Sequence, residues 1–360
     1  MDNPTDGSEP VETGGSGTPY TSPYAEEQAL ALAQLTSRFY RENADSFDST
    51  RQRPWDGWKR LANVLGEIWQ ADGNRTASDG GIGGETHTGT DSPFGWPKAL
   101  SWGQAPSLDS ADDGIGDARA ASDGRRPSRS PGAATDGSAS RRRVLDLGCG
   151  NLRFERFLEE RFPDERFEFE CIDDCTELVG PACSASDAEH AAGGDGTCTI
   201  AFKEADIVGT IAHGGALPVE SGAHDLSVAF GFMHHIPGED ARMQALRELS
   251  DSTGRGGIFA VSLWRFADDI KTRWKARRTT ATALEELSGL RGSGDLDLAP
   301  GDYLLGWQDR PGVFRYCHSF DDAEVERMVS ALEPEAWLID RYRADGRGGR
   351  ANEYLVFARL

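Results

Sequence analysis

This 360-residue sequence is poor in lysine and in long apolar runs. It has only five lysines among its 38 basic residues, so arginine carries almost all of the positive charge. No apolar stretch approaches the roughly 20 residues that a bilayer-spanning helix needs. The first ten residues, MDNPTDGSEP, have neither the basic nor the apolar part of a secretory signal. We therefore expect a cytoplasmic protein with no membrane partner.

Cysteines are also few, and their spacing argues against a metal centre. They are Cys149, Cys171, Cys175, Cys183, Cys198 and Cys317. None forms the Cys-x-x-Cys pair that is typical of a structural zinc site, and in a cytoplasmic protein we expect them to be reduced. The formal net charge of -22 argues mildly against a nucleic-acid partner, although a local patch of arginines can bind phosphates on a protein that is negative overall.

Composition divides the chain into folded and low-complexity segments. Residues 1–25, 71–140 and 184–196 are biased toward small and polar residues, and they contain too little apolar surface to offset the entropy of ordering them. We expect a disordered tail, a long insert and a short flexible insert there. Residues 26–70 carry apolar residues at helical spacing and predict an N-terminal helical cap, while residues 141–360 form the main domain.

From residue 141 onward, short apolar strands alternate with helical patterns. Strands are predicted at 144–147, 167–172, 199–203, 225–230 and 258–263, and helices at 151–162, 176–179 and 241–251. A helix at 325–332 and strands at 337–341 and 354–358 follow. This alternation predicts an α/β fold, with a Rossmann-like, doubly wound and mostly parallel sheet that ends in an antiparallel C-terminal edge strand.

The most informative stretch is VLDLGCGN at 144–151, where an apolar strand runs into Gly148 and Gly150 and then into a helix. Such a turn brings backbone N–H groups and a helix N-terminus against a nucleotide-like ligand. Asp146 would repel a pyrophosphate but attract a cationic amino-acid group. S-adenosylmethionine combines adenosine with an ammonium and a sulfonium, so we expect it as the cofactor. The alternatives are a plain tight turn for the glycines and a helix-dipole partner for Asp146.

Three further residues are expected to complete the cofactor site. Asp173 ends the second predicted strand, where a carboxylate can bind both ribose hydroxyls. Asp206 follows the third strand and would suit the adenine amino group; the alternative is a surface acid of the loop. Phe230 opens the loop after the fourth strand, which faces the ligand crevice at the carboxyl edge of a parallel sheet.

Over roughly residues 141–263 these features resemble class I S-adenosylmethionine-dependent methyltransferases. Flanking stretches are similar to a narrower family, the tRNA wobble-uridine carboxymethyl methyltransferases. FDSTRQRPW at 47–55 resembles its N-terminal signature, RYCHSF at 315–320 its Arg-Tyr-Tyr-His stretch, VSLW at 261–264 its fifth-strand ending, and Asn352 falls near its terminal asparagine–tryptophan pair. The resemblance implies methylation of the carboxylate of 5-carboxymethyluridine in the tRNA anticodon, with a small zinc-containing activator protein as partner.

Five residues are candidates for the acceptor site. A carboxylate acceptor is already ionised at neutral pH, so it must be positioned but needs no strong base. Arg51 and Arg315 can clamp a carboxylate or phosphate in bidentate fashion. Tyr316 could stack on a base, and His235 and His318 could donate hydrogen bonds to the acceptor.

Other interpretations stay open at this point. Arg51 could instead pair with Asp48, and residues 316–318 could form a plain sheet edge. One functional alternative is a small-molecule O- or N-methyltransferase that uses the N-terminal helices as a lid. Another is a non-catalytic S-adenosylmethionine-binding subunit, against which the intact Asp146, Gly148, Gly150 and His235 argue.

Overall fold

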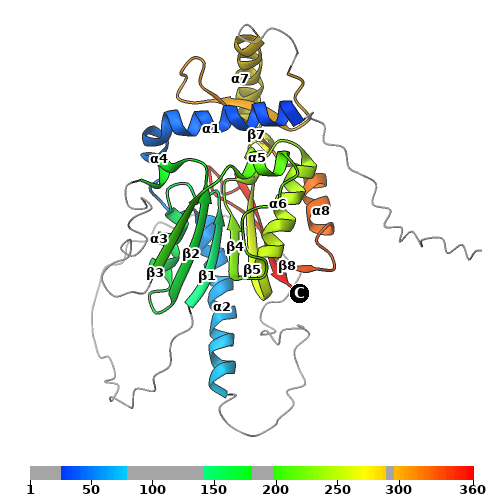
Figure 1. The fold of residues 1–360 in the computed structure, drawn as a ribbon. Coiled ribbons are helices and arrows are strands. Elements are labelled where there is room, and N and C mark those ends of the chain that lie inside the picture. The colour runs from blue at the N-terminus through cyan, green and yellow to red at the C-terminus, as the bar shows by residue number, and fades with distance from the viewer. Residues whose placement is uncertain (1–25, 79–140, 181–197, 289–295) are drawn as a thin grey trace, which may run out of the picture.

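The computed structural model describes residues 26–78, 141–180, 198–288 and 296–360 (Figure 1). The predicted disordered tail, the 184–196 insert and nearly all of the 71–140 insert lie outside these residues. Within the described part of the chain, no helix is both long and apolar enough to cross a membrane. The predicted α/β fold is confirmed, because a seven-stranded sheet carries helices on both faces.

The central sheet has the strand order β3-β2-β1-β4-β5-β9-β8. Its strands are β1 (Arg141–Leu147), β2 (Arg166–Asp173), β3 (Cys198–Glu204), β4 (His224–Ala229), β5 (Thr253–Trp264), β8 (Ala336–Ala344) and β9 (Asn352–Arg359). The first five are parallel, and the order reverses between β1 and β4, which is where open α/β sheets bind ligands. β9 is antiparallel to β5 and to β8, so the antiparallel C-terminal strand lies one position inside the edge.

Both faces of the sheet are covered. The neighbouring side chains of Phe259 and Ala260 in β5 are both fully buried, although successive side chains of a strand point to opposite faces. One face packs against α2 (Asp56–Ser78) and α3 (Arg153–Arg161). The other packs against α5 (Ile207–Ala212), α6 (Glu239–Ser252) and α8 (Asp322–Ser330). This two-sided burial explains why the strands are nearly continuous apolar runs.

A second layer covers the carboxyl ends of the parallel strands. Helix α1 (Glu26–Asp48) lies across this edge and packs against the short α4 (Thr176–Val179) and α5 (Figure 1). A two-stranded antiparallel sheet of β6 (Asp302–Gly306) and β7 (Phe314–His318) packs under α1, and α7 (Ile270–Ser288) packs on β6. Of the predicted N-terminal helices, α1 therefore covers the edge where a ligand would bind, and α2, on a face of the sheet, continues to Ser78, beyond the predicted boundary.

Candidate functional site

The turn between β1 and α3 has the geometry that its glycines predict. Gly148 has φ +75°, and an added Cβ would come within 2.6 Å of the Phe232 ring, so conformation and close approach both require glycine. Gly150 has φ +54°, and no described atom lies within 4 Å of where its Cβ would stand. Leu152, at the place of a third glycine, also has a left-handed φ of 55° and buries its side chain in the core.

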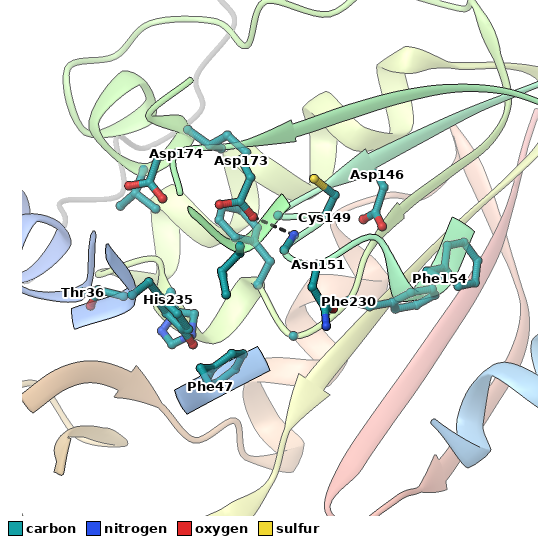
Figure 2. A pocket seen from close by; sticks show the side chains of 18 of the residues that line it. Thr36, Phe47, Asp146, Cys149, Asn151, Phe154, Asp173, Asp174, Phe230 and His235 are labelled. Atoms are coloured by element: carbon teal, nitrogen blue, oxygen red, sulfur yellow. Dashed lines mark hydrogen bonds between the residues drawn. The ribbon is translucent and has the colours of Figure 1, made fainter. Parts of the chain in front are cut away.

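This turn opens into a cavity with about 990 Å³ of empty space, the open solvent at its mouth included. All six predicted cofactor residues line it: Asp146, Gly148, Gly150, Asp173, Asp206 and Phe230. Figure 2 shows three of them converging on the cavity from the ends of different strands. The structure therefore brings together residues that are up to 84 positions apart in the sequence.

Asp146 lines this cavity and is almost completely buried. The residue is 3% exposed, and its Oδ1 has no hydrogen-bond partner among the described residues. Burial raises the pKa of Asp146 well above its ordinary value, and the neighbouring Glu155 raises it further. Because an unpartnered buried carboxyl is costly, this atom fits a cationic ligand group that would pair with it.

Asp173 fixes the glycine turn while still facing the cavity. Its Oδ2 accepts a hydrogen bond from the Gly150 N–H at 2.9 Å (Figure 2), and its Oδ1 accepts one from the Cys175 N–H, also at 2.9 Å. Burial raises the pKa of Asp173 to about 6, against the lowering effect of these two bonds. Each carboxylate oxygen can accept more than one hydrogen bond, so both remain able to bind hydroxyl groups.

Asp206 and Phe230 complete this cavity. Asp206 is exposed and caps α5, since its Oδ1 accepts a hydrogen bond from the Gly209 N–H at 2.7 Å. Asp206 is thus an acidic residue of the loop, as the alternative proposed, and it also lines the cavity. Phe230 is buried, and its ring meets that of Phe154 edge-on with centroids 4.9 Å apart (Figure 2). The cavity therefore combines acidic groups with a flat apolar wall.

A second cavity adjoins the first. Six residues line both of them: Tyr40, Phe47, Arg51, Trp55, Arg153 and Gly231. The second cavity is also lined by His234, Trp264, Arg315 and Asn352. A molecule held here would lie directly beside a ligand of the first cavity, which is the arrangement that a group transfer between two substrates requires.

Arg315 is a buried cation in the wall of the second cavity. It is 6% exposed, its Nε and Nη1 have no hydrogen-bond partner, and it forms no ion pair with a carboxylate of the described residues. Its guanidinium lies over the ring of Phe39, 4.6 Å from the centroid. Burying a charge without a partner is expensive, so this guanidinium points to an anionic ligand.

Arg51 brings a second cation to the same cavity. Its guanidinium lies 4.8 Å from the centroid of the Phe47 ring, and burial lowers its pKa, an effect that Arg315 increases. The alternative ion pair with Asp48 does not form; Asp48 accepts instead from the side chain of Asn151 at 2.6 Å. The two predicted arginines therefore face one space, as expected for a clamp.

His235 lies at the junction of the cavities but is fully engaged. Its Nδ1 lies 2.9 Å from the carbonyl oxygen of Tyr316, so Nδ1 must carry the proton, and Nε2 then accepts from the Tyr40 hydroxyl at 2.8 Å. Burial, together with the positive charge of Arg315, lowers the pKa of His235 to about 3. The imidazole is therefore neutral and holds Tyr40 in the cavity wall. Tyr40 was not predicted as a site residue, because in the sequence it belongs to an apolar helix face.

The structure corrects the expectation for Tyr316 and His318, since neither lines either of these two cavities. The Tyr316 hydroxyl donates to Asp302 at 2.7 Å, and His318 lies between Asp302 and Glu324, 2.7 Å from the latter. Burial opposes protonation of His318, but these carboxylates raise its pKa above the ordinary value. Residues 316–318 belong to strand β7, as the sheet-edge alternative proposed, and the side chains of Tyr316 and His318 belong to a buried polar network.

The segment between α1 and α2 is fastened over the glycine turn. Asn151 donates to the Arg51 carbonyl oxygen at 3.1 Å as well as to Asp48, and Arg153 donates to the Arg53 carbonyl oxygen at 2.9 Å. The predicted helical cap is thus part of the site. Asn151 and Arg153 were not predicted as site residues, because only their partners, about 100 positions away, reveal their role.

The described residues include one group of side chains with metal-ligand chemistry, His234, His235 and Cys317, whose donor atoms lie within 4.8 Å of one another. Nδ1 of His235 already donates to a carbonyl group, and Arg315 holds a positive charge beside the thiol. Both features oppose a divalent cation at this position.

No family model and no curated protein matches this chain. Among solved structures, it is similar to a methyltransferase from Methanosarcina mazei described as S-adenosylmethionine-dependent, with 14% identity, coverage of 61% of this chain and 93% of that chain, and a TM-score of 0.42. The N-methyltransferase NodS of Bradyrhizobium japonicum, in complex with S-adenosylhomocysteine, has 12% identity, coverage of 61% and 78%, and a TM-score of 0.35. The 1,6-didemethyltoxoflavin-N1-methyltransferase of Burkholderia thailandensis has 14% identity, coverage of 61% of this chain and 72% of that chain, and a TM-score of 0.37.

Proposed function

We propose that this protein is an S-adenosylmethionine-dependent methyltransferase that methylates a carboxylate, namely that of a modified wobble uridine in tRNA. One observation carries the choice of acceptor: Arg315 is a buried guanidinium with no anionic partner among the described residues, in a cavity that adjoins the candidate cofactor cavity. A carboxylate would satisfy it, whereas a neutral acceptor would leave the charge unpaired.

The first cavity fits the cofactor through its own polar atoms. Asp146 would pair its unpartnered Oδ1 with the ammonium group, Asp173 would accept from the ribose hydroxyls, and Asp206 would lie toward adenine. The open space in front of Gly150 lets the ligand approach the backbone closely. When bound, S-adenosylmethionine supplies a methyl group on a sulfonium, which is an electrophile.

The residues of the second cavity would position the acceptor. Arg51 and Arg315 would hold the carboxylate oxygens, and the rings of Trp55 and Trp264 would border a flat base. A carboxylate is ionised at neutral pH, so the neutral His235 need not take a proton. Orientation of two reactants in this manner can lower a barrier by about 7–11 kcal/mol.

The tRNA assignment draws on the two flanking stretches. Residues 47–55 and 315–320 are far apart in the sequence, yet Arg51 from the first and Arg315 from the second line the same cavity. Both stretches resemble the tRNA wobble-uridine carboxymethyl methyltransferases. Their convergence on one space supports the narrower proposal more than either stretch alone.

Labelling tests the proposal directly. The full chain is incubated with S-adenosylmethionine labelled in the methyl group and with fractionated cell extract. A second incubation also receives unfractionated extract, which would contain an activator. We expect label in the tRNA fraction that mild base releases, because a methyl ester hydrolyses in base and an N-methyl group does not. Label confined to the low-molecular-weight fraction would replace this proposal with a small-molecule methyltransferase.

A further inference from the structure

Helix α7 carries a strongly cationic surface on an acidic protein. Its first nine residues, IKTRWKARR at 270–278, contain five basic residues and no acidic one, while the whole chain has a formal net charge of -22. The acids just before the helix are engaged locally: Asp268 pairs with Arg343 at 2.7 Å, and Asp269 accepts from the Thr272 N–H at 2.8 Å. The positive charge of this segment is therefore presented to solvent.

Two large apolar side chains stand among these charges. Trp274 is 69% exposed and Ile270 is 68% exposed, whereas Ala276 on the opposite side of the helix is buried. Three exposed cations share the side of the helix on which Trp274 lies. Lys275 is its neighbour in the sequence, and Lys271 and Arg278 lie about one helical turn before and after it. An exposed indole surrounded by cations is not explained by the packing of α7 itself.

We propose that this surface, defined by Lys271, Trp274, Lys275 and Arg278, binds RNA, with phosphates on the cations and an unstacked base on the indole. Phosphate neutralisation and stacking on an aromatic ring are the two interactions that hold flexible RNA on proteins. The inference rests on the proposed function and deepens it, since it states where the RNA outside the acceptor nucleoside is held. A membrane fits less well, because only two apolar side chains are exposed and the inward face of α7 is packed on β6.

The position of α7 connects this surface to the acceptor cavity. Ala276 packs in one cluster with Phe266, and the ring of Phe266 lies 4.5 Å from that of Trp264, which lines the cavity. Thr280 ties the helix to β6 by accepting from the Leu304 N–H at 3.0 Å. Figure 1 shows α7 rising from the same edge of the sheet that α1 covers. An RNA chain that enters the acceptor cavity can therefore continue over α7.

Charge reversal tests this surface without touching the cavities. The probe is a fluorescent RNA stem-loop, and its affinity for the full chain is measured over a salt series without S-adenosylmethionine. We expect the triple variant Lys271→Glu, Lys275→Glu, Arg278→Glu to bind at least tenfold more weakly, with a salt slope smaller by about 2 because three phosphate contacts are lost. Trp274→Ala should weaken binding about tenfold with an unchanged salt slope, since stacking releases no counterions.

Matched controls separate a local surface from net charge. The first control is one triple variant with the same change in charge: Arg141→Glu, Arg166→Glu, Arg255→Glu. Its arginines are exposed and lie at the opposite, amino edge of the sheet. The second control, Trp337→Ala, removes another exposed indole. Both should keep the wild-type affinity, and all variants should melt within a few degrees of the wild type. Equal losses in the two triple variants, no RNA binding by the wild type, or stronger binding to phosphatidylserine vesicles than to RNA would overturn the proposal. Methyl transfer to a free carboxymethyl nucleoside, which depends on the cavities alone, tests the proposed function separately.

Discussion

The hydroxyl of Tyr40 and Nε2 of His235 lie 2.8 Å apart, which ties the N-terminal helix α1 to the loop after β4 at the junction of the two cavities. The two residues are 195 positions apart in the sequence. The contact makes α1 a wall of the site, and it gives His235 a fixed neutral tautomer. The histidine is thereby assigned to positioning.

This assignment predicts the behaviour of two substitutions at His235. His235→Gln can still accept from Tyr40 and donate to the Tyr316 carbonyl, so it should retain much more activity than His235→Leu, which can do neither. With a pKa of about 3, His235 should add no step to the pH–rate profile between pH 5 and 8. A step near pH 6.5 in the wild type that disappears in His235→Gln would identify the imidazole as a general base and refute the positioning role.

Asp146→Asn should separate cofactor binding from stability. The substitution removes the anionic partner of an ammonium group, so calorimetry should find affinity for S-adenosylmethionine reduced by about ten- to a hundredfold. The unliganded variant should melt at or above the wild-type temperature, because a buried carboxyl with an unpartnered oxygen is costly. A variant with wild-type affinity would remove Asp146 from the cofactor site.

The raised pKa of Asp173 predicts opposite pH trends for cofactor affinity and for the stability of the protein. Its pKa is about 6 in the free protein and 3.8 ordinarily, so the folded state binds the proton more tightly, and the unfolding free energy should fall as pH rises from about 4 to 6. The ribose hydroxyls donate to the charged form, so affinity for the cofactor should instead rise over this range and level off above pH 6. Calorimetry and denaturation across the range test both trends. Asp173→Asn serves as the control, and an affinity profile identical in the wild type and in this variant would contradict the assignment.

His318 should matter for stability and little for the cofactor. His318→Leu leaves the carboxylates of Asp302 and Glu324 without their shared partner, and breaking such a buried arrangement costs about 3–5 kcal/mol. Urea denaturation should detect this loss. At low temperature the folded variant should still bind S-adenosylmethionine with near wild-type affinity, and a selective loss of binding in a stable protein would return His318 to the site.

The sequence predicted the sheet and the residues that line the first cavity well, because both depend on local patterns. The apolar run before Gly148 and the carboxylates of Asp146, Asp173 and Asp206, at or just after the ends of the first three strands, lie at positions that topology brings to one edge. Helix α7 was not predicted, since its inward side chains are small or only partly buried: Ala276 and Ala283 are buried, whereas Leu284 and Leu287 pack partly against the core. Strand β6 was not predicted and β7 was considered only as an alternative for 316–318, because five residues carry little periodicity.

The acceptor side was harder to predict because it depends on distant pairings. Arg51 and Arg315 were identified by their chemistry and do face one cavity. Tyr316 and His318 offered equally suitable chemistry, but their orientation depends on Asp302, which no local pattern near 316–318 indicates.

The most direct test of the central claim is the rate of ester formation on tRNA that carries 5-carboxymethyluridine, measured for the wild type and for Arg315→Gln at saturating S-adenosylmethionine. The wild type should form a base-labile methyl ester. Arg315→Gln should be slower by about ten- to a hundredfold, the loss of one charge-assisted clamp, while its cofactor affinity and melting temperature stay at or above the wild-type values. Equal rates in the two proteins, or no ester from the wild type with or without added cell extract, would contradict carboxylate methylation at this site.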